Sequence, residues 1–253
     1  MPDIQKINRV DISNVERVNR VAGSNIEQLD GQGFVTFAPA TYTFNSTDSS
    51  WAIPGGTNHM DITVIGGGGC GTARSNISWA GFGGGGAGAS QATENTGGRI
   101  AVSSLNVNAL NITVGAGGTS QNTGGTAGLS SVAAGGITTI QANGGAQKDQ
   151  GNTYHHAGVS AGGTGSGGNT NTTGGTGGDA QEYPNTGRNG NNGACGGGAA
   201  GGAAVSGGNG GNGNEPGGAG GGGSHGHGGT SNFGTGADGR VIINTRSAST
   251  GNT

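Results

Sequence analysis

Short apolar segments separated by glycines and polar residues fill the chain from residue 33 to about residue 147. These segments are rich in β-branched and aromatic residues, and in most of them apolar and polar positions alternate, which is the pattern of β-strands with one buried face. They cover residues 34–37, 41–44, 60–65, 99–102, 110–114 and 137–141. We therefore expect a compact antiparallel sheet domain, with Trp51, Trp79 and most of the Phe and Tyr side chains in a small core.

The N-terminal segment contains a short internal repeat. Ile-Asn-Arg-Val at residues 7–10 returns eleven residues later as Val-Asn-Arg-Val at 18–21, and the apolar positions fall two or three residues apart. This spacing is tighter than a helical period and the apolar side chains are β-branched, so two or three turns of a small β-solenoid fit better than a helix. An eleven-residue period also suits a right-handed coiled coil, and that alternative stays open. Either structure has too small an apolar face to be stable alone, so we expect it to dock on a partner or on the next domain. The candidate attachment residues are Ile7, Val10, Val15, Val18 and Val21.

Glycine replaces the apolar pattern between residues 158 and 239. Of the 65 glycines in 253 residues, 36 lie between residues 151 and 240, whereas a soluble domain ordinarily carries about 7% glycine. Collagen is excluded because the glycines keep no third-residue register and proline is scarce. A flexible linker is the usual interpretation of such a composition, but the length of the segment and its regular alternation of glycine runs with other inserts argue against it.

Glycine runs can order a chain through the main chain alone. A run in the polyproline II conformation has no internal hydrogen bonds, so neighbouring runs have to supply partners for its N–H and C=O groups. Without Cβ atoms, many such runs can pack side by side and form a core of main chain instead of side chains. Residues 239–244 then form a closing strand that can return to the sheet domain.

The predicted fold class is mostly β plus polyproline II. We expect a small β-solenoid-like repeat at residues 1–32, an antiparallel β-rich attachment domain at 33–150, a bundle or sandwich of polyglycine II helices with protruding loops at 151–240, and a closing strand with a tail at 241–253.

Charge and cysteine content exclude several kinds of protein. The net charge is -3, from 10 basic and 13 acidic residues spread thinly, so no basic stripe is available for nucleic acid. No segment reaches the roughly 20 apolar residues of a membrane span, and the N-terminus lacks the pattern of a cleavable signal, so we expect a soluble protein that is not inserted in a membrane. Cys70 and Cys195 allow one disulfide at most, and two free thiols made in a reducing compartment fit this low content better.

Catalytic and metal-binding chemistry is not expected. Four of the five histidines form the pairs His155-His156 and His225-x-His227, but no Cys or carboxylate lies at a matching ligand spacing. The glycines at residues 81–86 match a dinucleotide fingerprint by chance in so glycine-rich a chain, and no helical segment follows them. No nucleophile has a convincing base partner. We therefore expect a noncatalytic protein without a metal or other cofactor.

Four features follow one another along the chain. They are the Ile-Asn-Arg-Val repeat, Asp-Ile-Thr-Val-Ile with four glycines at 61–69, Ile-Thr-Val-Gly-Ala-Gly-Gly at 112–118, and the C-terminal glycine runs with inserts. In this order, and over essentially the whole chain, they resemble the receptor-recognising adhesins at the tip of the long tail fibre of T-even-like bacteriophages. The resemblance implies that the N-terminal region attaches to a trimeric tail-fibre protein. It also implies that a C-terminal polyglycine sandwich presents variable loops to a host outer-membrane protein, a porin or another β-barrel. The protein would then lie at the distal tip of the fibre in the virion, after synthesis in the host cytoplasm.

The inserts between the glycine runs are the candidate receptor-binding loops. Loops on a rigid scaffold concentrate recognition residues, and Tyr and Arg are enriched at binding hot spots. The histidine pairs are better explained as adaptable contact residues than as metal ligands. The candidate residues are Tyr154, His155, His156, Asn171, Glu182, Tyr183, Arg188, Val205, His225, His227 and Phe233.

Two other functions stay open. One is a tail-fibre assembly chaperone that aids trimer folding and is absent from the mature virion. The other is a structural glycine-rich protein, such as an ice-binding or matrix component, which should carry a regular flat repeat of Thr or Ala. The irregular, aromatic-bearing inserts speak against the structural alternative.

Overall fold

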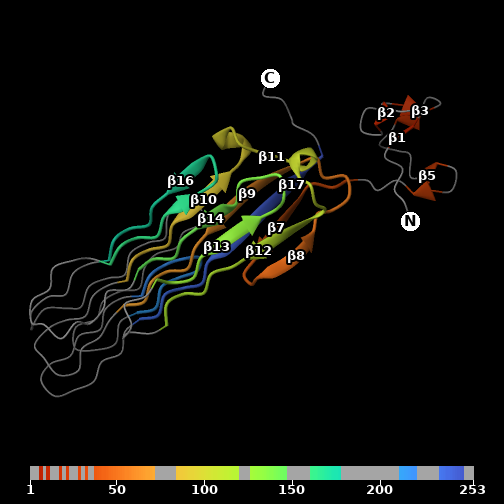
Figure 1. The fold of residues 1–253 in the computed structure, drawn as a ribbon. Helices are drawn as coiled ribbons and strands as arrows, with labels where there is room; N and C mark the ends of the chain where they lie inside the picture. The colour runs from red at the N-terminus through yellow and green to blue at the C-terminus, as the bar shows by residue number, and fades with distance from the viewer. Residues whose placement is uncertain are drawn as a thin grey trace, which may run out of the picture.

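Two antiparallel β-sheets with a shared core form the centre of the protein (Figure 1). The computed structural model describes residues 37–71, 84–119, 126–146, 160–177, 211–220 and 234–247, together with the backbone of short strands before residue 34. Within these residues strands predominate, and the only helical turns are the 3-10 helices η3 (Glu94–Thr96) and η4 (Val102–Ser104). The predicted mostly-β class is therefore confirmed.

The first sheet has six strands. Its order is β16 (Thr170–Thr172), β10 (Ala89–Ala92), β9 (His59–Ile65), β17 (Arg240–Arg246) and β7 (Ala40–Phe44), and β11 (Ile100–Ala101) also pairs with β9. The two longest strands, β9 and β17, pair over seven positions, from Ile65 opposite Arg240 to His59 opposite Arg246. The last described strand, β17, thus lies between β7 and β9.

The second sheet has five strands. Its order is β15 (Gly165–Ser166), β14 (Ile140–Ala142), β13 (Ser130–Ala133), β12 (Ala109–Thr113) and β8 (Asp48–Ala52). The strands β7 and β8 follow each other in the chain, as do β15 and β16, so each pair carries the chain from one sheet to the other.

The side-chain core lies between the sheets, where alternate residues of each strand point inward. On β9 the inward residues are Met60, Ile62 and Val64, each fully buried. The other buried members of the cluster are Ala92, Leu110, Ile112, Val132, Ile140, Ala142, Val241 and Ile243. At the β8 edge, the ring of Trp51 lies edge-on to that of Phe44, with centroids 5.5 Å apart. The predicted core position of Trp51 is confirmed, whereas Trp79 lies outside the described residues.

Apolar alternation predicted some strands and missed others. The predicted segments 41–44, 60–65 and 110–114 correspond to β7, β9 and β12. The strands β8, β10 and β13 were missed because Ser, Ala and Gln occupy much of them and leave little apolar pattern. The segment predicted at 137–141 shortens to β14, because a turn with Gly136 at φ 92° precedes it.

The N-terminal repeat consists of antiparallel two-stranded hairpins in its described residues. They are β1 (Lys6–Ile7) with β2 (Val10–Asp11), β3 (Arg17–Val18) with β4 (Val21–Ala22), and β5 (Gln28–Leu29) with β6 (Gln32–Gly33). The hairpins recur every eleven residues, and their strands contradict the coiled-coil alternative for these residues. Stacking of the hairpins as a solenoid stays a prediction. Of the attachment candidates, Ile7, Val10, Val18 and Val21 lie on these strands, and Val15 lies outside the described residues.

Glycine-rich runs extend the two sheets in one direction (Figure 1). The strands β9, β10 and β12 to β17 each continue into such a run. We call these runs the glycine bundle: residues 66–71, 84–88, 114–119, 126–129, 143–146, 160–164, 173–177, 211–220 and 234–239.

The glycine bundle draws on both sides of residue 150. The glycines at 66–69 and 115–118 were expected between strands of the β-rich domain at 33–150, but in the structure they belong to runs of the bundle. Conversely, residues 165–172 were expected in the bundle and instead contain β15 and β16. The reason is that the partners of a glycine run lie far away in sequence, so nothing in the run itself identifies them.

Candidate functional site

The run at 66–71 lies at the centre of the glycine bundle. Its main chain exchanges hydrogen bonds with six other runs: 84–88, 115–119, 126–129, 143–146, 218–220 and 234–239. Two bonds of one residue illustrate this packing: Gly68 N donates to Ala237 O at 2.8 Å, and Gly68 O accepts from Gly118 N at 2.8 Å. Main-chain hydrogen bonding between runs, expected from the composition, is therefore present.

Donors three residues apart point to the same neighbouring run. Gly66 and Gly69 both donate to run 84–88, with N to O distances of 3.1 and 2.9 Å. Gly68 and Gly71 both donate to run 234–239, at 2.8 and 2.9 Å. The same spacing recurs for Gly84 and Ala87, Gly85 and Gly88, Asn143 and Ala146, Gly174 and Gly177, and Gly236 and Gly239. These five runs thus present amides three residues apart to the same neighbour.

The runs approach too closely for side chains between them. A Cβ added at Gly68 would lie 2.1 Å from Gly218 O, and one at Gly145 would lie 1.8 Å from Gly85 O. These obstructing atoms are main chain and have no rotamer to change. Glycine is therefore required here by the packing of the bundle, not by a turn.

At the end of the bundle far from the sheets, the described parts of the outgoing runs end and those of the returning runs begin. Five segments outside the described residues are the connections between these runs: 72–83, 120–125, 147–159, 178–210 and 221–233. Their described ends are linked by hydrogen bonds from Gly71 N to Gly234 O (2.9 Å), Gly84 N to Gly220 O (3.0 Å), Gly85 N to Ala146 O (3.0 Å), Gly177 N to Ser160 O (2.8 Å) and Thr235 N to Asn212 Oδ1 (3.0 Å), and by the bridge between Thr126 and Ala146. The bundle thus fixes the ends of all five connections close to one another. We call this the insert end.

Ten of the eleven predicted receptor-binding residues belong by sequence to three of these connections. Tyr154, His155 and His156 belong to 147–159, Glu182, Tyr183, Arg188 and Val205 to 178–210, and His225, His227 and Phe233 to 221–233. All ten lie outside the described residues. The structure therefore places the ends of their segments together at the insert end.

The eleventh residue, Asn171, lies elsewhere. The loop predicted around it is strand β16, which pairs with β10 at the edge of the six-stranded sheet. Its Oδ1 accepts from Ser90 Oγ at 2.6 Å, and its Nδ2 donates to Gly168 O at 2.9 Å. The strand was missed because its residues are small and polar and show no apolar alternation. The Asn171 amide forms hydrogen bonds within the sheet region.

Sequence reasoning overlooked two connections of the insert end, 72–83 and 120–125. The first contains Arg74, Trp79 and Phe82, and Trp79 had been assigned to the core. A signal was available: the four glycines at 66–69 are a run of the same kind as those nearer the C-terminus. Treating every strand followed by consecutive glycines as the start of a run would have found the first connection.

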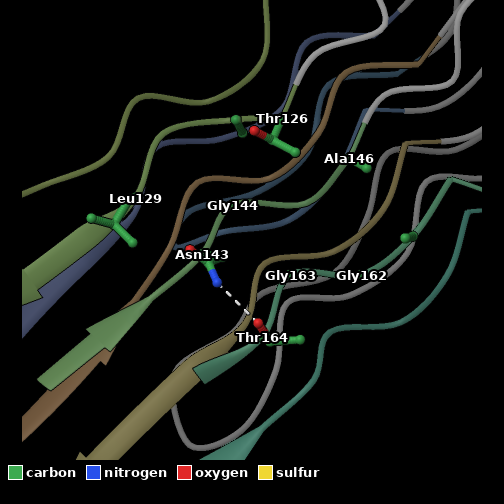
Figure 2. Close-up of a pocket in the computed structure, with 10 residues that line it drawn as sticks. Thr126, Leu129, Asn143, Gly144, Ala146, Gly162, Gly163 and Thr164 are labelled. Carbon is green, nitrogen blue, oxygen red and sulfur yellow. Dashed lines mark hydrogen bonds between the residues drawn. The ribbon is translucent and has the colours of Figure 1, made fainter. Parts of the chain in front are cut away.

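A pocket of about 320 Å³, which we call the groove, lies on the bundle beside the five-stranded sheet (Figure 2). Asn143 Nδ2 donates to Thr164 Oγ1 at 2.9 Å across it, and Leu129 is 38% exposed at its sheet side. The described residues that line the groove are Thr, Ala, Leu, Asn and Gly, without a titratable side chain. Such a lining offers hydrogen bonds and van der Waals contact and no acid–base chemistry.

Charged side chains meet at the opposite end of the six-stranded sheet. Asp61 is 5% exposed and accepts from Glu94 N (2.8 Å), Arg99 Nε (3.4 Å) and Arg246 Nε (3.0 Å). Arg99 also pairs with the Glu94 carboxylate. This network ties β9, β17 and the 93–99 loop together.

Two kinds of site are absent from the described part of the chain. It holds no group of three His, Cys, Asp or Glu residues arranged for a metal ion. Nor does any helix within it have the length and apolar character to cross a membrane.

Comparison with protein families identifies one family that matches most of the chain. The family described as a glycine-rich domain matches residues 43–246, from within β7 to the last residue of β17. The match spans both sheets and the whole glycine bundle, and the chain belongs to this glycine-rich domain family. No curated protein sequence matches the chain.

Proposed function

We propose that this glycine-rich domain protein is a noncatalytic adhesin at the tip of a phage long tail fibre, which recognises a host outer-membrane protein through its insert end. One observation carries the proposal: the hydrogen-bonded bundle brings the ends of all five connections together, and three of these connections hold the Tyr, Arg and His residues suited to recognition. The sequence resemblance to tail-fibre adhesins supplies the biological setting.

The insert end is well suited to recognition because its support is rigid. Each run is hydrogen-bonded to several others, so little ordering of the scaffold is needed on contact. Changes of sequence in a connection leave the described core of the bundle unaffected, because main-chain bonds between the runs form that core. These properties allow the recognised receptor to change while the fold is kept.

The finer structure of the runs belongs to this proposal. We infer that they are polyglycine II helices, with three residues per turn. The repeated spacing of three residues between donors to the same neighbour supports this conformation. Fibre diffraction or vibrational spectra of the isolated protein can test it.

Attachment to the fibre is assigned to the N-terminal repeat. Its apolar residues Ile7, Val10, Val15, Val18 and Val21 would contact the trimeric fibre protein, and stacking of the hairpins as a small solenoid would align them. The first described residue after the repeat, Phe37, leads into β7, whose N-terminal end lies away from the glycine bundle. The chain would then enter β7 from the repeat at the end of the sheets opposite the bundle. This arrangement would let the protein act as an adaptor between fibre and receptor.

The decisive experiment measures binding of the purified protein to outer-membrane preparations from strains that each lack one porin or other barrel protein. We expect binding to most preparations, its loss in one deletion strain, and competition with phage adsorption. A folded protein that binds none of the preparations would overturn the proposal. Detecting the protein in purified virions by mass spectrometry separates an adhesin from an assembly chaperone, which is absent from the particle.

Alanine substitutions then locate the binding residues. Tyr183→Ala and Arg188→Ala should each weaken receptor binding by about tenfold, as expected for hot-spot side chains. Asn111→Ala, at an exposed position of β12, is the matched control and should bind normally. Asn171 is left out of the proposed site because its amide is engaged within the sheet. Unchanged binding in several of the variants 154–156, 183, 188, 225, 227 and 233 would contradict the assignment.

A further inference from the structure

Strands β7 and β17 are antiparallel, so the N-terminal end of β7 and the C-terminal end of β17 lie side by side at the same end of the sheet. The register runs from Val241 opposite Phe44 to Thr245 opposite Ala40 over five antiparallel pairs. The glycine run 234–239 leads directly into Arg240, the first residue of β17, and Val241 comes next, so the Phe44 end of β7 faces the bundle. The Ala40 end faces away from it.

The pair at the outer end is reinforced by a side chain. Ala40 N donates to Thr245 Oγ1 at 3.2 Å, and Thr245 Oγ1 donates to Ala40 O at 3.3 Å. Beside it, Thr41 Oγ1 donates to Asn244 Oδ1 at 2.6 Å. On its other edge β17 is held by seven pairs to β9.

We propose that β7, β17 and β9 form a directional mechanical clamp. A force between the chain before Ala40 and the insert end acts along β7, because the two points lie beyond opposite ends of the strand. Antiparallel hydrogen bonds run perpendicular to the strands, so this force shears all five β7–β17 pairs at once. A force between Ala40 and the chain after Arg246 pulls on two points at the same end. It opens the pairs one after another, beginning with Ala40 and Thr245.

The pulling direction in which the clamp resists most is the direction of the load on an adhesin. That load would pass from a receptor at the insert end to a fibre at the N-terminus. That relevance rests on the proposed function. The anisotropy itself depends only on the register and topology of the strands. Failure of receptor binding and failure of the clamp are therefore separate results.

Single-molecule force spectroscopy on the full chain tests the clamp. In the shearing geometry, one handle is attached at the N-terminus and the other at an azide-bearing residue that replaces Thr119, an exposed position on the bundle. In the peeling geometry, the handles are attached at the N- and C-termini. Both proteins carry the azide-bearing residue, so they share one sequence, and circular dichroism checks that it folds like the unmodified chain.

We expect the first rupture of the sheet domain to need at least about twofold more force in the shearing geometry, because several ladder bonds break together instead of singly. Equal forces in the two geometries, or a weaker shearing geometry, would overturn the clamp. Thr245→Val, which keeps the side-chain volume and removes both bonds to Ala40, should lower the force of first peeling. An unchanged peeling force would also contradict the clamp, because the Ala40–Thr245 pair would not be the one that opens first.

Discussion

The sheets and the glycine bundle are two parts of one chain with opposite kinds of core. Between the sheets, Ile62, Leu110 and Ile243 are fully buried, and side-chain packing excludes water. In the bundle, Gly67, Gly68 and Gly69 are buried against the main chain of other runs, and hydrogen bonds replace side-chain contacts. The first core is stabilised by apolar area. The second depends on the absence of side chains.

Because of this difference, the two regions are destabilised by opposite kinds of substitution. A sheet core tolerates a change of shape between large apolar residues and suffers from truncation. The glycine positions of the bundle have no side chain to truncate, and they suffer from an added atom, because a Cβ there meets main chain at about 2 Å. Substitutions in the two regions should therefore differ in both size and kind of effect.

Adding one methyl group at the centre of the bundle should have the largest effect. In Gly68→Ala the new Cβ lies 2.1 Å from Gly218 O, so an entire run has to move. We expect a loss of more than about 4 kcal/mol in the free energy of unfolding, measured by denaturant titration, which is exceptional for a change this small. Gly135→Ala is the control, since its Cβ would lie 3.6 Å from the nearest atom, and it should change stability by under about 0.5 kcal/mol. Equal stability of the two variants would contradict the main-chain core.

Truncation of the sheet core comes next. Ile62→Ala removes buried carbons from a fully buried position and should lower the free energy of unfolding by about 3 kcal/mol, through lost transfer energy and a cavity. Thr63→Ala, on the same strand and facing the other side of the sheet, should cost under about 1 kcal/mol. If Thr63→Ala were the more damaging change, the assignment of the inner face would be wrong.

Loss of the buried charge at Asp61 should have a smaller effect. Asp61→Asn keeps the shape but removes the anion that faces Arg99 and Arg246, whose side chains are 8% and 44% exposed. We expect a loss of about 2 kcal/mol, because a buried cation is left less well paired while water reaches the other one. Asp48→Asn, which affects a local bond to Ser50 N, should stay within about 0.5 kcal/mol. If Asp61→Asn left the free energy of unfolding unchanged, the charge network would not stabilise the sheet.

The smallest effect should come from loss of the ion pair between Glu215, in the turn at 215–217 of the bundle, and Arg240 of β17. Arg240 Nη2 lies 3.3 Å from Glu215 Oε2, and the Glu215 side chain is 55% exposed. Solvent and salt screen such a pair, so Glu215→Gln should change the free energy of unfolding by under about 0.5 kcal/mol. A loss that is large at low salt and absent at high salt would show that charge, and not only main-chain bonding, holds the bundle.

The sequence predicts local features well and partners poorly. The alternation in β9 and β12 and the β-branched residues of β17 were sufficient to predict these strands, and the glycine content predicted a main-chain core. The polar strand β16 was not predictable, because it depends on its pairing with β10, which lies far away in the sequence. The glycines at 66–69 can be recognised as a run, but the residues they bond, such as Gly88 for Gly66, cannot be read from the run itself. The candidate inserts could be identified from their composition. Their gathering at one end follows from the hydrogen bonds between runs, which no single segment encodes.

Amide hydrogen exchange can show, residue by residue, whether main-chain bonding makes the bundle a rigid support for the insert end. We predict that the amides of Gly67, Gly68, Gly69, Gly85 and Gly145 exchange only through global unfolding, with the same protection as Ile62 in β9. Exchange of these glycines at the rate of an unfolded chain, while Ile62 stays protected, would contradict the account and make the glycine runs a linker instead of a scaffold.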